Sequence, residues 1–204
     1  KTYQHGDYQS FYVHDPKRRH IHKAEVADRI IHHLLYKYLY KIFDKTFIFD
    51  SYSCRLDKGT HKAVDRLVKF TRIVSKNYTK KCWILKLDIK KFFANVDHQI
   101  LITLLKKKIK DQDILWLLKE VIDSFPLGIP LGNLTSQVFA NIYMNELDQF
   151  MKHNLKIKYY LRYADDFVII SSKRVDLDQY LEPIISFLND RLKLCLHPKK
   201  IILR

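Results

Sequence analysis

The sequence has few of the residues that cross-link a chain or interrupt its secondary structure. Its 204 residues include three cysteines, four glycines and five prolines. Cys54, Cys82 and Cys195 are far apart and show no Cys-x-x-Cys spacing, which argues against a disulfide framework and against a zinc site. This cysteine usage fits a reduced, intracellular setting.

Long apolar runs, repeats and low-complexity tracts are also lacking. No apolar run approaches the roughly 18 residues that cross a bilayer, and no signal peptide precedes the first periodic segment, so we expect no membrane association. The length predicts one domain or two closely joined lobes. Because the chain starts at Lys1 and stops abruptly after Arg204, we expect both ends to be cut from a longer chain.

The charge of the chain is strongly positive. There are 37 Lys and Arg against 22 Asp and Glu, a formal net charge of +15. Since the basic residues are spread over most segments, a polyanionic partner is the leading interpretation, and a basic surface kept for solubility is the alternative. The pairs His32-His33 and His20-x-His22 have no cysteine or carboxylate residues at a spacing known from metal sites. We therefore interpret them as surface or packing residues.

Hydrophobic periodicity predicts a mixed α+β domain with a helical lobe ahead of it. Helices are predicted over residues 23–47, 59–78, 97–110, 113–125, 135–153 and 177–194, and strands over 81–89, over 159–171 as a hairpin, and over 200–204. Asn133 or Thr135 is the expected cap of the fifth helix. The apolar faces of the first two helices are expected at Val26, Ile30, Ile31, Leu34, Leu35 and Leu39, and at Ala63, Val64, Leu67, Val68 and Ile73.

Three aspartates occupy positions where a carboxylate is costly to bury. Asp88 ends an alternating apolar strand, and Asp165 and Asp166 lie at the tip of an apolar hairpin. If the hairpin packs beside that strand, the three carboxylates converge and require a cation, which two Mg²⁺ ions would supply. The alternative is an ordinary turn and an ordinary strand end, because aspartate favours turns.

Several segments around these aspartates resemble the palm motifs of reverse transcriptases, in the order in which that family carries them. They are "LKLDIKKFF" with Asp88, "GIPLGNLTSQVFANIYMNELD" with Gly132, "YADD" with Asp165 and Asp166, and "LCLHPKK" as the last palm motif. Upstream, "DPKRRHIHKAEVADRIIHHLL" and "DSYSCRLDKGTHKAV" resemble fingers motifs of bacterial reverse transcriptases. The resemblance covers almost the whole chain.

The resemblance implies a particular α+β fold, the right-hand polymerase palm, in which helices back an antiparallel sheet, with a helix-rich fingers subdomain. Fingers with part of the palm would occupy residues 1–80, and the palm with the catalytic aspartates residues 81–204. The thumb would be absent, since no primer-grip hairpin or helical thumb follows Arg204. We therefore expect this segment alone to hold a primer–template weakly.

The resemblance also implies the catalytic and metal-binding residues. Asp88 and Asp165 would bind both catalytic Mg²⁺ ions, for which Mn²⁺ can substitute, while Asp166 supports the site. The backbone carbonyl of Ile89 would complete a metal shell. Lys200 of "HPKK" would protonate the leaving pyrophosphate, although the adjacent Lys199 offers a second register.

Further residues would contact the nucleotide and the nucleic acid. Phe93 would block a ribose 2′-hydroxyl, with its neighbour Phe92 as the expected core residue. Gly132 would let the backbone approach the nascent base pair, and Gln137 would touch template or nucleotide, with a plain helix-surface role as its alternative. Arg55 and Lys58 would contact the triphosphate, and Lys17, Arg18 and Arg19 would contact phosphates of the template or the triphosphate. For each of these basic residues the alternative is a solvated surface role.

The implied function is an RNA-directed DNA polymerase in the cytoplasm of a bacterial or archaeal-type cell. Its partners would be template RNA, primer, nascent cDNA and dNTPs. "PLGNLTSQ" departs from the Pro-Gln-Gly of group II intron enzymes and resembles diversity-generating retroelement reverse transcriptases, which copy RNA with errors at adenines and work with a small basic accessory protein. A group II intron-like or phage-defence enzyme, a cyclic-dinucleotide synthase palm and a noncatalytic RNA-binding module are the alternatives.

Overall fold

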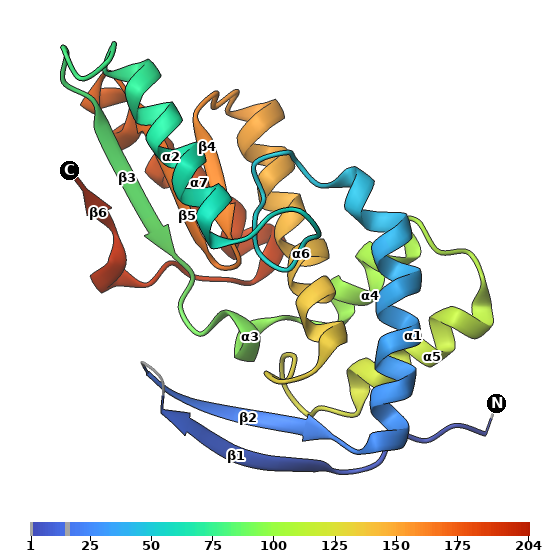
Figure 1. Ribbon diagram of the computed structural model, residues 1–204. Helices are drawn as coiled ribbons and strands as arrows, with labels where there is room; N and C mark the ends of the chain where they lie inside the picture. The colour runs from blue at the N-terminus through green and yellow to red at the C-terminus, as the bar shows by residue number, and fades with distance from the viewer. Residues whose placement is uncertain (1, 15–16) are drawn as a thin grey trace. The chain divides into compact units, whose positions relative to one another are not determined.

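The computed structural model describes residues 2–14 and 17–204 (Figure 1). The chain forms two compact units, and each unit is built from two separate stretches of sequence. Unit 1 comprises Lys1–Thr46 and Phe93–Tyr143, and unit 2 comprises Phe47–Phe92 and Met144–Arg204. The predicted division into fingers at 1–80 and palm at 81–204 stays a prediction.

The elements follow the predicted order, with a hairpin and several short helices added. Unit 1 holds β1 (Tyr8–His14), β2 (Arg18–Ala24), α1 (Val26–Phe43), a 3₁₀ turn (Asp44–Thr46), α4 (His98–Lys106), α5 (Gln112–Asp123) and the start of α6 (Leu134–Gln149). The short α3 (Phe92–Asn95) begins at the unit boundary. Unit 2 holds α2 (Thr60–Val74), β3 (Trp83–Asp88), a π-helical turn (Phe150–Asn154), β4 (Tyr160–Tyr163), β5 (Asp166–Ser171), α7 (Arg174–Leu192), a 3₁₀ turn (Pro198–Lys200) and β6 (Ile202–Leu203).

The β1–β2 hairpin of unit 1 was not predicted from the sequence. Its strands pair antiparallel from Tyr8 opposite Ala24 to His14 opposite Arg18. Most of its side chains are exposed, so the alternation of apolar and polar residues that marks a half-buried strand is missing. Asn133, the residue before α6, donates from Nδ2 to the carbonyl of His22 (2.7 Å) and so joins β2 to the start of that helix.

The buried side of α1 differs from the predicted apolar face. Polar side chains can replace apolar ones in a core when they are hydrogen-bonded, and two such residues are buried here. The Oη of Tyr3 donates to Asp28 (2.7 Å), and Nδ1 of His32 lies 2.6 Å from Oγ1 of Thr135. The buried residues are Asp28, His32, Leu35, Leu39 and Phe43, whereas Val26, Ile30 and Leu34 are exposed, which corrects the prediction.

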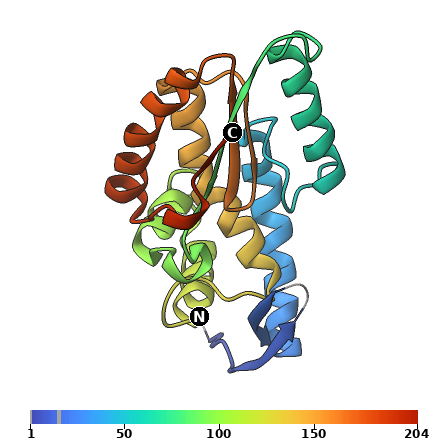
Figure 2. The same ribbon diagram turned by 90° about the vertical axis from the view of Figure 1, so that its left-hand side faces the viewer.

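Unit 2 contains an antiparallel four-stranded sheet in the order β4-β5-β3-β6. α2 and α7 cover opposite faces of this sheet (Figure 2). The fold is therefore mixed α+β with helices backing an antiparallel sheet, and the predicted fold class is confirmed. In the part of the chain that the structure describes, no helix is both long and apolar enough to cross a membrane.

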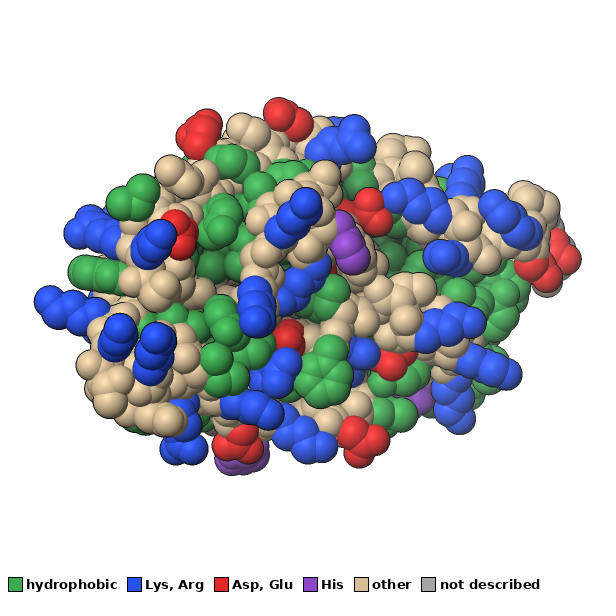
Figure 3. Space-filling view, turned by 90° about the horizontal axis from the view of Figure 1, so that it is seen from above, with side chains coloured by type: hydrophobic (Ala, Val, Ile, Leu, Met, Phe, Trp, Pro, Cys, Tyr) green, Lys and Arg blue, Asp and Glu red, His purple; other side chains and the backbone are tan. Residues whose placement is uncertain are grey.

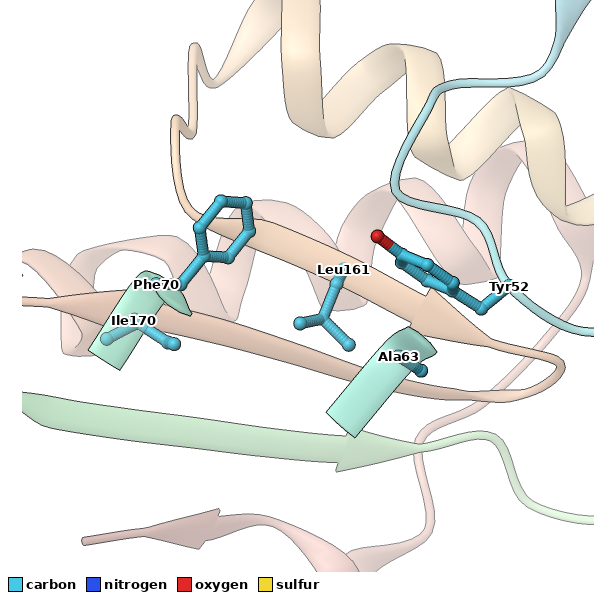
Figure 4. Packing of buried hydrophobic residues seen from close by; sticks show 5 residues of the cluster. All are labelled: Tyr52, Ala63, Phe70, Leu161 and Ile170. Atoms are coloured by element: carbon cyan, nitrogen blue, oxygen red, sulfur yellow. The ribbon is translucent and has the colours of Figure 1, made fainter. Parts of the chain in front are cut away.

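The core between α2 and the sheet is small and partly aromatic (Figure 4). It is formed by Tyr52, Ala63, Phe70, Leu161 and Ile170. α2 contacts the sheet through Ala63 and Phe70, and Leu67 is partly buried there. Val64, Val68 and Ile73, which were predicted on the apolar face, are exposed because the helix touches the sheet along a narrower stripe.

Candidate active site

The structure places Asp88 and the hairpin that carries Asp165 and Asp166 at one end of the sheet. Asp88, the last residue of β3, lies directly opposite Asp166, the first residue of β5. Directly opposed residues on adjacent strands have their side chains on the same face. Asp165 lies in the two-residue turn between β4 and β5, and its carbonyl accepts a hydrogen bond from the backbone N–H of Ile89 (3.3 Å).

The three carboxylates create an excess of negative charge in a partly buried place. Asp88 is 5% exposed. Burial raises the pKa of Asp165, and the neighbouring charges of Asp88 and Asp166 raise it further. Each of these effects disfavours the ionised form of Asp165, so a positively charged partner would stabilise its carboxylate.

Two lysines supply part of that positive charge. Nζ of Lys200 donates to Oδ2 of Asp88 at 2.6 Å, and this hydrogen bond raises the pKa of Lys200. Nζ of Lys86 lies 3.2 Å from Oδ1 of Asp166. That oxygen is closed to solvent, yet it accepts no hydrogen bond from any described residue, since the approach of Lys86 does not have hydrogen-bond geometry.

These observations bear on whether divalent ions fit the site. Within residues 2–14 and 17–204, no three His, Cys, Asp or Glu side chains are grouped so that they could hold a metal ion as they stand. The donor chemistry nevertheless fits magnesium, because the site offers carboxylate oxygens and one of them, Oδ1 of Asp166, lacks a hydrogen-bond donor. That Asp88, Asp165 and Asp166 hold such ions stays a prediction.

The predicted triphosphate residues of unit 2 lie in the loop before α2. Arg55 donates from Nη1 to the carbonyls of Ile48 (2.8 Å) and Ser51 (3.1 Å). Nζ of Lys58 donates to the carbonyl of Phe49 (2.8 Å) and lies 3.5 Å from the centre of the Phe49 ring. Lys58 also lines a surface groove beside α2. Both basic side chains therefore stabilise the loop, and a role with phosphates stays a prediction.

The other predicted nucleotide residues belong to unit 1. Phe93 is partly buried, whereas Phe92 is 1% exposed, so the prediction that Phe92 is the core residue is confirmed. Gln137 is exposed on α6. A Cβ on Gly132 (φ 111°) would lie 2.6 Å from Cγ2 of Ile21, so packing against β2 also explains this glycine.

The predicted nucleic-acid residues Lys17, Arg18 and Arg19 are exposed at the start of β2. The guanidinium of Arg18 lies 3.9 Å from the centre of the Tyr12 ring. Asp15 and Pro16, which open the matching motif, lie outside the described residues. Lys and Arg side chains also stand out over the face shown in Figure 3. An exposed basic cluster suits phosphate contacts, although exposure alone does not assign them.

Sequence reasoning missed the buried ion pair beside this site. Nη2 of Arg162 in β4 donates to Oδ2 of Asp148 in α6 at 2.7 Å, and neither side chain is exposed. A signal was present, since an arginine within a buried strand requires an acidic partner. The spacing between the two residues, however, gives no indication of which acid that partner is.

Comparison with known proteins establishes the family. The family model "Reverse transcriptase (RNA-dependent DNA polymerase)" matches residues 14–203, and the chain belongs to this family. Relatives include "Protein YkfC" of Escherichia coli, 24% identical over 217 residues that cover 86% of this chain and 56% of that protein. The "Group II intron-encoded protein LtrA" of Lactococcus lactis is 29% identical over 143 residues, 65% of this chain and 22% of that protein.

A third relative is the "Uncharacterized 91 kDa protein in cob intron" of Schizosaccharomyces pombe, 30% identical over 142 residues, 65% of this chain and 17% of that protein. The chain thus covers less than two thirds of each relative's length. Among solved structures, telomerase from Candida albicans in complex with a fragment of telomeric RNA superposes with a TM-score of 0.71 at 12% identity, over 100% of this chain and 43% of that one. Apo telomerase from Candida tropicalis superposes with a TM-score of 0.69 at 12% identity, over 98% of this chain and 45% of that one. These structures show the shared fold.

Proposed function

We propose that this chain carries the catalytic centre of an RNA-directed DNA polymerase that copies an RNA template into cDNA. One observation carries the proposal: Asp88 lies opposite Asp166 on adjacent strands, and Asp165 is in the turn beside them. Family membership supports it, because residues 14–203, which match the family model, include all three aspartates. Residues 81–204 would then form the palm, and residues 1–80 the fingers with part of the palm.

Each acidic residue has a role in the proposed reaction. Asp88 and Asp165, with the carbonyl of Ile89, would hold two Mg²⁺ ions, and Asp166 would support them. When bound, such ions lower the pKa of the primer 3′-hydroxyl and stabilise the charge on the leaving pyrophosphate. The carboxylates would act as ligands rather than as a general acid and base.

The basic and aromatic residues would bind and select the nucleotide. Lys200 would donate a proton to the leaving pyrophosphate. The ordinary pKa of lysine is 10.5 and the hydrogen bond to Asp88 raises that of Lys200 further, so its side chain is protonated at neutral pH. Arg55 and Lys58 would contact the triphosphate. Phe93 would exclude a ribose 2′-hydroxyl by steric contact.

The test is extension of a primed RNA template with dNTPs and Mg²⁺ by the full-length protein. Asp165→Ala should abolish extension while leaving the protein folded. Asp190→Ala, at an exposed position of α7, is the matched control and should retain the wild-type rate. Extension by Asp165→Ala at near wild-type rate would overturn the assignment. RNA binding with strong salt dependence but no extension by the wild type would favour a noncatalytic RNA-binding module.

A narrower role is diversity generation, in which the enzyme copies its template with errors at adenines and works with a small basic accessory protein. "PLGNLTSQ", which contains Gly132 and Gln137, supports this role over that of a group II intron-like or phage-defence enzyme. Sequencing of the cDNA should show misincorporation concentrated opposite template adenines. An even error spectrum would contradict this narrower proposal and leave the polymerase assignment intact.

A further inference from the structure

Arg162 is a fully buried arginine three residues before Asp165. Its side chain is 0% exposed. Nε donates to Oδ1 of Asp148 (2.8 Å), and Nη2 donates both to Oδ2 of Asp148 (2.7 Å) and to Oγ of Ser51 (3.1 Å). Nη1 donates to the carbonyl of Ala164 (2.9 Å). The guanidinium thus joins the end of α6 to the turn that carries Asp165.

The pair persists as a charged pair. Burial is the largest single effect on Arg162 and works to lower its pKa. The charge and hydrogen bonds of Asp148, together with the charges of Tyr160 and Asp165, outweigh it, so the pKa rises above its ordinary value. Asp148 accepts a further hydrogen bond from Oη of Tyr160 (2.6 Å). Apolar side chains of similar volume often replace a buried ion pair without loss of stability. Stability alone therefore does not account for an arginine at this position, and the contact with Ala164 offers a specific reason.

The turn between β4 and β5 needs external support. Ala164 has φ 54°, a left-handed conformation that residues other than glycine rarely adopt. Because a peptide group is planar, a hydrogen bond to the carbonyl of Ala164 also fixes the N–H side of that peptide, which belongs to Asp165. The next peptide is held from the other side, since the N–H of Ile89 donates to the carbonyl of Asp165. Both peptide planes that flank Asp165 are thus fixed.

We propose that Arg162, oriented by Asp148, is a positioning residue that fixes the Ala164–Asp165 peptide and so directs the Asp165 carboxylate toward the site beside Asp88. The inference rests on the proposed function. Polymerase activity would then require Arg162 and Asp148, although neither is among the predicted metal-binding or nucleotide-binding residues.

The experiment replaces the ion pair by apolar residues in the full-length protein, as Arg162→Met with Asp148→Leu. Thermal unfolding reports the fold, kcat and KM for dNTP report catalysis, and Mn²⁺ titration of the protein alone, followed by electron paramagnetic resonance, reports the carboxylate site. We expect cooperative unfolding with a melting temperature somewhat below that of the wild type, because Oη of Tyr160 loses its acceptor, and a KM that changes little. We expect kcat to fall by about 10²-fold, and Mn²⁺ binding to weaken several-fold.

Tyr160→Phe is the matched control, because it removes a hydrogen bond from Asp148 without touching the turn. It should lower the melting temperature and leave kcat and Mn²⁺ binding unchanged. If the double variant does not fold, Arg162→Lys replaces it, since one ammonium cannot contact Asp148, Ser51 and Ala164 together, and the same losses are expected.

A folded double variant, or a folded Arg162→Lys variant, with wild-type kcat and Mn²⁺ affinity would overturn the inference. Failure of the proposed function is a distinct outcome, because the wild type itself would then make no cDNA. In that case the Mn²⁺ titration still decides whether Arg162 positions Asp165.

Discussion

The ammonium of Lys200 lies 2.6 Å from Oδ2 of Asp88, so a side-chain cation already occupies one oxygen of the expected metal site. Lys200→Gln removes the charge and keeps a polar side chain. We expect the maximal rate of extension to fall by about 10²-fold because the proton donor to pyrophosphate is lost. We also expect half-maximal extension at a lower Mg²⁺ concentration, because a competing cation is gone. Rates measured over a series of Mg²⁺ concentrations separate the two effects.

Lys199→Gln is the matched control for this prediction. Lys199 is exposed beside Lys200, and its side chain is not hydrogen-bonded to Asp88. Its replacement should change neither the rate nor the Mg²⁺ dependence. A larger loss at Lys199 than at Lys200 would show that the second register of "HPKK" is the functional one.

Phe93 is expected to determine sugar selectivity. In Phe93→Ala the steric barrier to a 2′-hydroxyl disappears, so the preference for dNTP over the matching rNTP, as a ratio of kcat/KM values, should fall at least about tenfold. The rate with dNTP should change much less. Single-nucleotide extension with each substrate measures both quantities. An unchanged ratio in a folded variant would assign Phe93 to packing alone.

The sequence was informative about the site wherever spacing along one strand or turn determines geometry. The alternation that ends at Asp88 predicts a buried strand, and the apolar flanks of Asp165 predict a hairpin. These two predictions placed Asp88 at the end of a strand and Asp165 in a hairpin turn before the structure was known. The register that sets Asp88 opposite Asp166 required the structure, because pairing is a long-range property.

Other features cannot be predicted from the spacing of apolar residues, because they depend on contacts between residues distant in the sequence or lie on the surface. Asp28 and His32 are buried on α1 because distant residues satisfy their hydrogen bonds, and periodicity counts only apolar side chains. The partner of Arg162 is 14 residues away along the chain, and several acids are nearer or equally plausible from sequence. Exposed hairpins such as β1–β2 lack the alternation that would reveal them.

Gly128 is expected to be intolerant of any side chain. Its φ is 69°, and a Cβ would lie 2.2 Å from the carbonyl oxygen of Phe93 and 2.8 Å from Cα of Ala94, both backbone atoms. Gly128→Ala should therefore lower the free energy of unfolding by about 2–4 kcal/mol, from the combined conformational strain and overlap. Urea denaturation followed by circular dichroism measures the change.

Gly59→Ala separates these two contributions. Gly59 also has a positive φ, 113°, but a Cβ there would meet nothing within 4 Å. Only the conformational cost remains, so we expect a loss of about 1–2 kcal/mol. Equal losses at the two glycines would show that the backbone near Phe93 moves to accept a methyl group.

The buried His32 makes the stability of unit 1 depend on pH. Burial lowers its pKa to about 4, and the adjacent charge of His5 contributes in the same direction, against the opposite effect of Asp28. Nε2 of His32 lies 3.0 Å from Nε2 of His5. The unfolded chain, in which the pKa is near 6.5, therefore binds more protons than the folded chain between pH 4 and 6.5.

Stability that depends on neutral His32 is thus fully present above pH 6.5 and is lost as the pH falls toward 4. The loss should reach on the order of 3 kcal/mol, measured by urea denaturation at a series of pH values. His32→Gln cannot titrate, so its stability should vary less over the same interval, even if the variant is less stable at pH 7. If the free energies of unfolding of wild type and variant decrease in parallel as the pH falls, other groups cause the acid sensitivity. His32 would then be accommodated in its protonated form by its contacts with His5 and Thr135.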